Sequence, residues 1–337
     1  AACANRGSQV RRTTPLSRLP EKSESDLVPL RRRLGDRLYT KRLQRQTDKT
    51  IRFLHQGRGV FRLERLIPFD SLLSAFFKFF GIREMMRRGF LDVRVVEQGW
   101  VLPSLPEAFE GFRLLQLTDL HCDLDPALTA VVADLIRVCP HDAAVITGDF
   151  RNGMGGDHEV CLRETRRIVE TLNSQRWGIL GNHDFIEMVP ELESMGLPIL
   201  LNEVTEIRRG GASIWMGGID DPHFYQTHDL AEVRARIPRE ACAILLSHSP
   251  ETYREAAGLG FHLHLSGHTH GGQICLPGGT PLVVPCRVPR RLVVGRWSHG
   301  EMQGYTSPGT GGCGVAARWN CPPEITVHTL RSGRQFG

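Results

Sequence analysis

The stretch RLLQLTDLH, residues 113–121, decides the fold that this sequence predicts. Its first five residues favour a short buried strand, and an Asp-x-His pair, Asp119 and His121, follows at once. The same pattern recurs along the chain. Further apolar runs that favour strands lie at 143–147, 177–180, 213–216, 243–246, 263–265 and 325–330. Amphipathic runs at 126–138 and 161–172 favour helices. Strands that alternate with helices in this way predict an α/β fold with buried sheets.

Residues that can bind a metal ion follow five of the predicted strands. The motifs are Asp119-x-His121, Gly148-Asp149, Gly181-Asn182-His183-Asp184, Ser247-His248 and Gly267-His268-Thr269-His270. In open α/β sheets functional side chains gather beyond the carboxyl ends of the strands, so we expect these motifs to converge. Alternate residues of a strand point the same way, so Asp119 and His121 could share one ion. Carboxylate, imidazole and amide ligands favour a pair of divalent cations, and Asp149 is the natural bridge between them.

Charge is divided unevenly along the 337 residues. Residues 1–100 hold 22 Lys and Arg against 10 Asp and Glu, whereas residues 101–337 hold 20 against 27. Hydrophobic residues make up 41% and charged residues 23%, which excludes collagen-like, coiled-coil and wholly disordered classes. The nine cysteines are odd in number, scattered and without a C-x-x-C pair. We therefore expect reduced, mostly buried thiols and no thiolate metal ligand.

The chain before the α/β domain divides into two segments. Residues 1–50 are Arg-rich and predict a basic, flexible tail with little packing. Residues 51–98 predict an amphipathic helical segment, because apolar residues at helical spacing form one stripe. These are Phe69, Leu72, Leu73, Phe76, Phe77 and Phe80. The stripe is too short to span a bilayer, so the segment could rest on an anionic lipid surface or dock on the domain at 99–332.

In this order and spacing, the five motifs resemble those of the calcineurin-like metallophosphoesterase superfamily over residues 112–330. Three longer motifs are GHTHGGQ at 267–273, GIDD at 218–221 and NCPPEI at 320–325. They resemble the YkuE/YaeI-like bacterial branch, which includes lipid A pathway hydrolases of the LpxG type. The resemblance implies a four-layer α/β/β/α sandwich with two mixed sheets, preceded here by an N-terminal helical extension.

The resemblance also implies roles for the motif residues. The first metal ion would be held by Asp119, His121 and His270, the second by Asn182, His248 and His268, with Asp149 bridging them. The catalytic histidine that contacts the phosphate would be His183, oriented by Asp184. The candidates for substrate binding are Arg151, Asn152 and Asp220. The cofactor would be two divalent metal ions, with manganese favoured over iron, zinc and cobalt.

The implied reaction is hydrolysis of a phosphate ester or diphosphate by a hydroxide that bridges the two ions. A lipid-linked substrate such as UDP-2,3-diacylglucosamine is expected, cut by a cytoplasmic protein that contacts the inner face of the cytoplasmic membrane. One alternative is a nuclease or general phosphodiesterase whose basic tail binds nucleic acid, and another is a noncatalytic scaffold. We favour neither, because no platform of spaced aromatic residues accompanies the tail and every ligand position is filled.

Two groups of residues outside the motifs remain open to more than one interpretation. Arg287, Arg290 and Arg291 could bind a diphosphate or form a solvated basic turn. His223 and His228 lie in a predicted loop, where they could meet either substrate or solvent.

Overall fold

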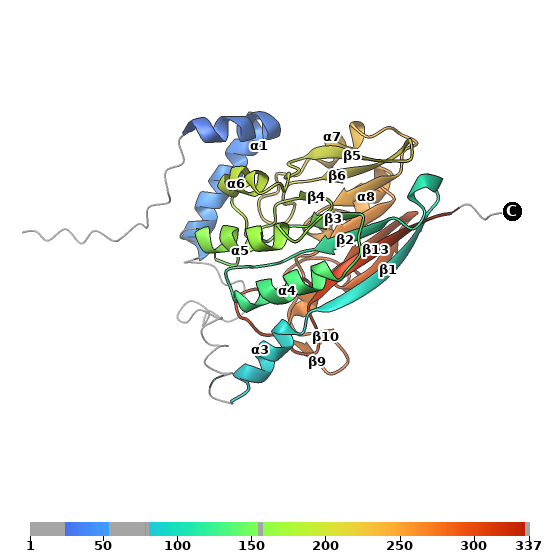
Figure 1. Ribbon diagram of the computed structural model, residues 1–337. Helices are drawn as coiled ribbons and strands as arrows, with labels where there is room; N and C mark the ends of the chain where they lie inside the picture. Colours follow the sequence, from blue (N-terminus) through green and yellow to red (C-terminus); the bar gives the residue numbers. More distant parts are fainter. Residues whose placement is uncertain (1–23, 54–77, 79–80, 154–157, 334–337) are drawn as a thin grey trace, which may run out of the picture.

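Two stacked mixed sheets with helices on their outer faces form the body of the protein (Figure 1). The computed structural model describes residues 24–53, 78, 81–153 and 158–333. The first sheet has the order β1-β13-β2-β3-β4, with β1 at Arg94–Leu102, β2 at Arg113–Leu117, β3 at Ala143–Ile146, β4 at Gln175–Gly178 and β13 at Glu324–Ser332. The second has the order β11-β12-β8-β7-β6-β5, with β5 at Glu203–Arg209, β6 at Ala212–Gly218, β7 at Ala243–Leu246, β8 at Leu263–Ser266, β11 at Gly295–His299 and β12 at Met302–Thr306. A separate hairpin pairs β9, Cys275–Leu276, with β10, Thr280–Pro281.

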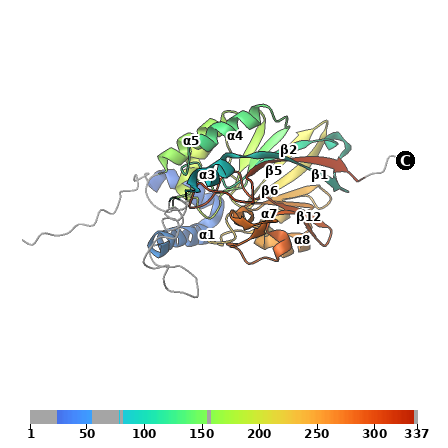
Figure 2. The ribbon, with the colours of Figure 1, turned by 90° about the horizontal axis from the view of Figure 1, so that it is seen from below.

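Helices cover the outer face of each sheet. On the first sheet lie α4, Ala127–Arg137, α5, Glu159–Val169, and α6, Val189–Ser194, and on the second lie α7, Leu230–Ala235, and α8, Tyr253–Gly258. Figure 2 shows α4 and α5 on one side of the sheets and α7 and α8 on the other. In each sheet parallel and antiparallel pairs occur together; β2, for example, runs parallel to β3 and antiparallel to β13. The predicted α/β/β/α sandwich with two mixed sheets is confirmed.

Strand β2 explains why the sheets stack. Leu114 packs between the two sheets in one apolar cluster, whereas Leu115 and Leu117 pack beneath the helices in another. Successive side chains of a strand point to opposite faces, so a continuous apolar run buries both faces of its sheet. The inner cluster includes Ile244 and Leu265 of the second sheet, and this packing fixes the separation of the two sheets.

The domain begins earlier in the chain than expected. Strand β1 starts at Arg94 and pairs in parallel with β13, so its first residues lie within the segment 51–98 that was predicted to be helical. Its first eight residues include several that are exposed, which gives it the weak apolar pattern of an edge strand. The helix α3, Arg83–Leu91, precedes it and docks on the domain through the buried side chains of Met86 and Phe90.

Residues 24–50 differ from the predicted flexible tail. They lie in the helix α1, Glu24–Phe53, which bends at Gly35, where φ is 74°. Leu30 and Leu34 of this helix are buried in the apolar cluster beneath the first sheet. The expectation of little packing is therefore wrong for this part of the chain.

Two arginines of α1 form ion pairs with carboxylates of the domain. The charge pattern of the sequence around these arginines does not indicate these pairs. The Arg33 guanidinium contacts Glu193 at 2.9 Å and Glu203 at 2.7 Å. Arg42 is 0% exposed and contacts Asp220 at 2.5 Å. These partners lie more than 150 residues away in the sequence, so the run of arginines resembles a solvated tail until the domain folds against it.

All six residues of the Phe69–Phe80 stripe lie outside the described residues, so the contact of this stripe with lipid stays a prediction. Among the helices that the structure describes, none is long and apolar enough to cross a bilayer.

The buried pair of Arg42 and Asp220 gives a test of how α1 is attached. Replacing Arg42 with Ala leaves the Asp220 carboxylate buried without its cation, and this should lower the free energy of unfolding by about 3–5 kcal/mol. The midpoint of urea unfolding measures the change. Arg37→Ala, at an exposed position of the same helix, should change stability by less than about 0.5 kcal/mol. Equal midpoints for the two variants would show that the Arg42–Asp220 pair does not stabilise the fold.

Candidate functional site

The predicted motifs meet at one end of both sheets. Asp119 and His121 follow β2, and Asp149 follows β3 in the first sheet, whereas His248 follows β7 and His268 follows β8 in the second. Strands β2 and β3 run parallel to each other, as do β7 and β8, so their carboxyl ends bring these loops to a common edge. The structure therefore brings the motifs together at one edge, as expected from the sequence.

The backbone reaches this arrangement through an unusual conformation. Asp119, His121, Asp149, His268 and His270 all have φ between 42° and 70°. Non-glycine residues rarely adopt this left-handed region, and such strain clusters at functional sites. The Asp119 and His121 side chains therefore meet through left-handed turns, and not through the alternation of an extended strand that the sequence suggested.

The first group of donor atoms lies around His121. Its Nε2 is 3.4 Å from Nε2 of His270 and 3.7 Å from Oδ2 of Asp149. Oδ1 of Asp119 lies 3.4 Å from the same His270 nitrogen. Ligands about 2.0–2.2 Å from one cation are separated by roughly such distances, so the spacing fits a single ion.

The second group lies around His248 and shares Asp149 with the first. Nε2 of His248 is 3.2 Å from Oδ2 of Asp149 and 3.1 Å from Oδ1 of Asn182. His268 joins them, since one of its ring nitrogens lies within 4.8 Å of the Asp149 and His248 donors. Among the described residues, Nε2 of His268 is a buried nitrogen without a hydrogen-bond partner, as expected of an atom placed to bind a cation.

Backbone carbonyls orient two of these imidazoles. Nδ1 of His121 donates to the Arg151 carbonyl at 2.7 Å, and Nδ1 of His248 donates to the Thr147 carbonyl at 2.8 Å. Each bond commits Nδ1–H to a carbonyl and turns Nε2 toward the donor group. The residues present therefore fit a pair of divalent cations in both the type and the orientation of their donors.

The electrostatics of the site also suit cations. Although burial opposes it, the charges of His248 and His183 hold the pKa of Asp149 well below its usual value. Burial lowers the pKa of His268 and of His270 well below the usual value, so both rings are neutral. Against the effect of its burial, Asp149 raises the pKa of His248 to about 10. Cation binding must therefore displace a proton from His248.

His183 lies beside these groups, and its ring centroid is 4.9 Å from that of His121. Its Nδ1 donates to the Asn152 carbonyl at 3.0 Å, and its backbone N–H donates to Oδ1 of Asp149 at 2.8 Å. Because Nδ1 faces the Asn152 carbonyl, Nε2 of His183 points away from Asn152. The ring is thus oriented by Asn152, and not by Asp184 as expected.

Asp184 instead holds the backbone of the site. Its two carboxylate oxygens accept hydrogen bonds at 2.8 Å from the N–H groups of Asp149, Phe150 and Gly181. Burial, together with the charge of Asp149, raises the pKa of Asp184 to about 6. This carboxylate ties the turn after β3 to the loop that carries His183.

Of the three predicted substrate contacts, Asp220 is wrong. It is 0% exposed, and its two oxygens accept from Arg42 and from the Thr227 hydroxyl. Arg151 is also buried, with its guanidinium 4.3 Å from the centroid of the Phe185 ring, and it serves the site through its carbonyl. The burial of Arg151 and Asp220 depends on distant parts of the chain, so the local sequence does not indicate it.

Asn152, the third predicted substrate contact, joins two loops. Its carbonyl holds His183, and its side-chain oxygen accepts from the Gly314 N–H at 2.7 Å. That bond fastens the glycine-rich segment 309–314 to the site.

Two further residues lie at the site: Cys313, which was not predicted there, and His223, which the sequence left open between substrate and solvent. Sγ of Cys313 lies 3.7 Å from Nε2 of His183 and within 4.8 Å of donor atoms of His121 and His270. The His223 ring lies 4.2 Å from that of His268, between centroids. Both residues line the cavity of about 260 Å³ beside the donor groups. The glycines around Cys313 are the sequence feature that could have indicated its place at the site. They let the backbone of this segment pack closely against the turn after β2, because a Cβ at Gly311 would lie only 2.3 Å from the Leu120 carbonyl oxygen.

The sequence of this chain is similar to those of a known protein family and of several of its members. Residues 112–272 match the calcineurin-like phosphoesterase family. Phosphodiesterase YaeI of Escherichia coli is 31% identical over 260 residues, which cover 72% of this chain and 93% of YaeI. The uncharacterized metallophosphoesterase YkuE of Bacillus subtilis is 27% identical over 240 residues, covering 68% of this chain and 82% of YkuE.

Among solved structures, the phosphopantetheinyl hydrolase of Mycobacterium tuberculosis aligns with a TM-score of 0.40 and 11% identity over 59% of this chain and 89% of that one. The likeness to YaeI extends over nearly the whole of that relative, and the residues of the family motifs gather here at one edge of two sheets. This chain belongs to the calcineurin-like phosphoesterases, in the branch of YkuE and YaeI, and is a hydrolase of phosphoester bonds.

Proposed function

We propose that this protein hydrolyses phosphodiesters or diphosphates at a centre of two divalent cations that Asp149 bridges. The observation that carries the proposal is the position of Oδ2 of Asp149, which lies 3.7 Å from Nε2 of His121 and 3.2 Å from Nε2 of His248. One carboxylate oxygen thus faces both donor groups. In two-metal hydrolases the ions lie about 3.5–4 Å apart, and a shared carboxylate sets such a separation.

Each donor group holds one ion in this proposal. The first ion is bound by Asp119, His121 and His270, and the second by Asn182, His248 and His268. The pair of cations supplies a water of lowered pKa as nucleophile and neutralises charge on the phosphate. We propose manganese as the metal, with iron, zinc and cobalt also accepted by these nitrogen and oxygen donors.

His183 acts on the phosphate in this proposal. Because the Asn152 carbonyl accepts from Nδ1, the other nitrogen of the ring faces the cavity of about 260 Å³ that Asp149 and Asn182 also line. In the imidazolium form the ring carries a second proton at Nε2, which can stabilise a nonbridging oxygen or be transferred to the departing oxygen and leave the ring neutral.

We further propose a lipid-linked substrate at the inner face of the cytoplasmic membrane, such as the UDP-2,3-diacylglucosamine that the resemblance implied. The Phe69–Phe80 stripe leads into α3, where Met85 is 44% exposed and Arg83 and Arg88 are exposed beside it. Exposed apolar and basic side chains together favour contact with anionic lipid.

Substitutions at Asp149 and His183 should separate binding of the metals from chemistry. Asp149→Ala should lose bound metal and hydrolysis together, because it removes the shared oxygen. His183→Ala should keep both ions and lower kcat by about 10²–10⁴-fold. Metal analysis and the hydrolysis of bis(p-nitrophenyl) phosphate measure the two properties. Full metal content and full activity in Asp149→Ala would refute the bridged centre. Asp134→Ala, on the exposed face of α4, is the matched control.

The carboxylate of Asp184 should stabilise the site without binding metal. In Asp184→Asn an amide nitrogen replaces an oxygen that accepts backbone N–H groups, so the free energy of unfolding should fall by about 1–3 kcal/mol. The affinity for manganese should fall by about 10–100-fold, because the ligand loops lose their orientation. Urea unfolding and manganese titration provide the measurements, with Asp134→Asn as control. Unchanged values for both would remove Asp184 from the supporting set.

Contact with lipid is tested by sedimentation with vesicles. The full chain should sediment with vesicles that contain phosphatidylglycerol, and a Phe76→Ser and Phe77→Ser double variant should stay in the supernatant, because the stripe loses apolar area. Equal sedimentation of both proteins would contradict the membrane proposal and leave the reaction untouched.

A further inference from the structure

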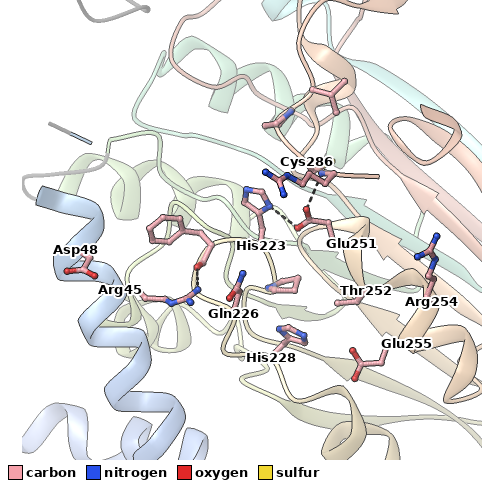
Figure 3. Close-up of a pocket in the computed structure, with 15 residues that line it drawn as sticks. Arg45, Asp48, His223, Gln226, His228, Glu251, Thr252, Arg254, Glu255 and Cys286 are labelled. Atoms are coloured by element: carbon pink, nitrogen blue, oxygen red, sulfur yellow. Dashed lines mark hydrogen bonds and ion pairs between the residues drawn. The ribbon is translucent and has the colours of Figure 1, made fainter. Parts of the chain in front are cut away.

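A second, larger cavity of about 1150 Å³ opens beside the site (Figure 3). Its walls come from three separate parts of the domain and from α1. The parts are the loop 222–228 after β6, the segment 251–255, which includes the start of α8, and the segment 284–287. From α1, Arg45 reaches toward the loop, while Arg254 lies on the opposite wall. A cavity of this size can hold a ligand well beyond a single phosphate group.

The two cavities share part of their lining. His223 and Pro285 line both the large cavity and the smaller one beside the donor groups. The His223 ring packs on the ring of His268, and its Nδ1 contacts a Glu251 oxygen at 2.8 Å. A molecule whose phosphate lies at the donor groups can therefore extend past His223 into the large cavity.

Three arginines line the large cavity, together with the carboxylates of Asp48, Glu251 and Glu255. Among the described residues, Arg45, Arg254 and Arg287 form no ion pair with a carboxylate. Arg45 donates to the Phe224 carbonyl at 2.6 Å, and the Arg254 guanidinium lies 5.3 Å from the centroid of the Tyr253 ring. Arginine donors in a fixed fork match the oxygens of a phosphate, which makes them the usual residues for phosphate recognition.

The carboxylate nearest to the shared wall is already bound within the protein. Glu251 contacts His223, and it accepts from the Ser249 hydroxyl at 3.2 Å and from the Arg287 backbone N–H at 3.2 Å. Its charge is thus committed to protein donors, so it does not compete fully for the arginines.

We propose that the large cavity binds a second phosphate group of the substrate, on the part of the molecule that flanks the scissile phosphate. This inference rests on the proposed function and names the substrate class for that same site, namely diesters or diphosphates that carry a further anionic group. It also gives α1 a role in recognition, because Arg45 forms one wall.

The test uses two synthetic diesters that differ by one group. Ethyl p-nitrophenyl phosphate carries a single phosphate, and its 2-phosphoethyl analogue adds a terminal one. Release of p-nitrophenol reports the same bond cleavage in both. The wild-type protein should show a lower KM for the analogue, and an Arg254→Ala and Arg287→Ala double variant should raise that KM about tenfold, with kcat within twofold. Its KM for the ethyl ester should stay unchanged. Added salt should raise the KM of the analogue alone.

The matched control is Arg290→Ala, an exposed arginine of the same basic turn that is not part of the cavity lining. It should leave both KM values unchanged. An equal rise of KM for the two esters in the double variant, or no rise for the analogue, would overturn the second-phosphate site while hydrolysis persists. Failure of the proposed function is distinguishable, because the wild-type protein would then release no more p-nitrophenol from either ester than Asp149→Ala does.

Discussion

The position of the Asp149 carboxylate is the constraint on which the rest of this site depends. One of its oxygens holds the backbone of His183, and the other faces His121 and His248. His121 follows a strand of the first sheet and His248 a strand of the second, so the carboxylate lies where the two sheets meet. The apolar layer between the sheets, with Leu114 and Ile244 in its core, therefore sets the distance between the two donor groups. Close packing of this layer makes that distance stiff.

The loops of the site are held in place against a local cost. A non-glycine residue in the left-handed region costs of the order of 1–3 kcal/mol when it is strained, and five residues of the site, Asp119, His121, Asp149, His268 and His270, adopt it. Backbone bonds between neighbouring strand ends offset this cost. The N–H of Asp119 donates to the Gly148 carbonyl at 2.9 Å, and that of His121 donates to the Asp149 carbonyl at 3.0 Å. The turns after β2 and β3 thus fix each other.

The helix α1 belongs to this supporting structure although it lies far from the motifs in the sequence. The Arg42 guanidinium donates to the Asp184 carbonyl at 3.0 Å, and the Gln46 side chain accepts from the Ile186 N–H at 2.9 Å. Both bonds act on the loop directly after His183. The helix therefore links the N-terminal region to the conformation of the loop that carries His183 and, through Arg45, to the larger cavity.

From the sequence alone came the α/β class, the buried strands such as β2 and β7, and the set of residues that meets at the strand ends, whereas the two-sheet sandwich came from the family resemblance of the motifs. Apolar periodicity and ordered motifs are local, so they survive without coordinates. The tertiary structure alone decided what depends on distant partners. It turned the basic run of residues 24–50 into a docked helix, placed Asp220 in a buried ion pair with Arg42, and brought Cys313 beside His183. The physical reason is that ion pairing and burial depend on residues that are far apart in the chain, so patterns among neighbouring residues do not predict these contacts.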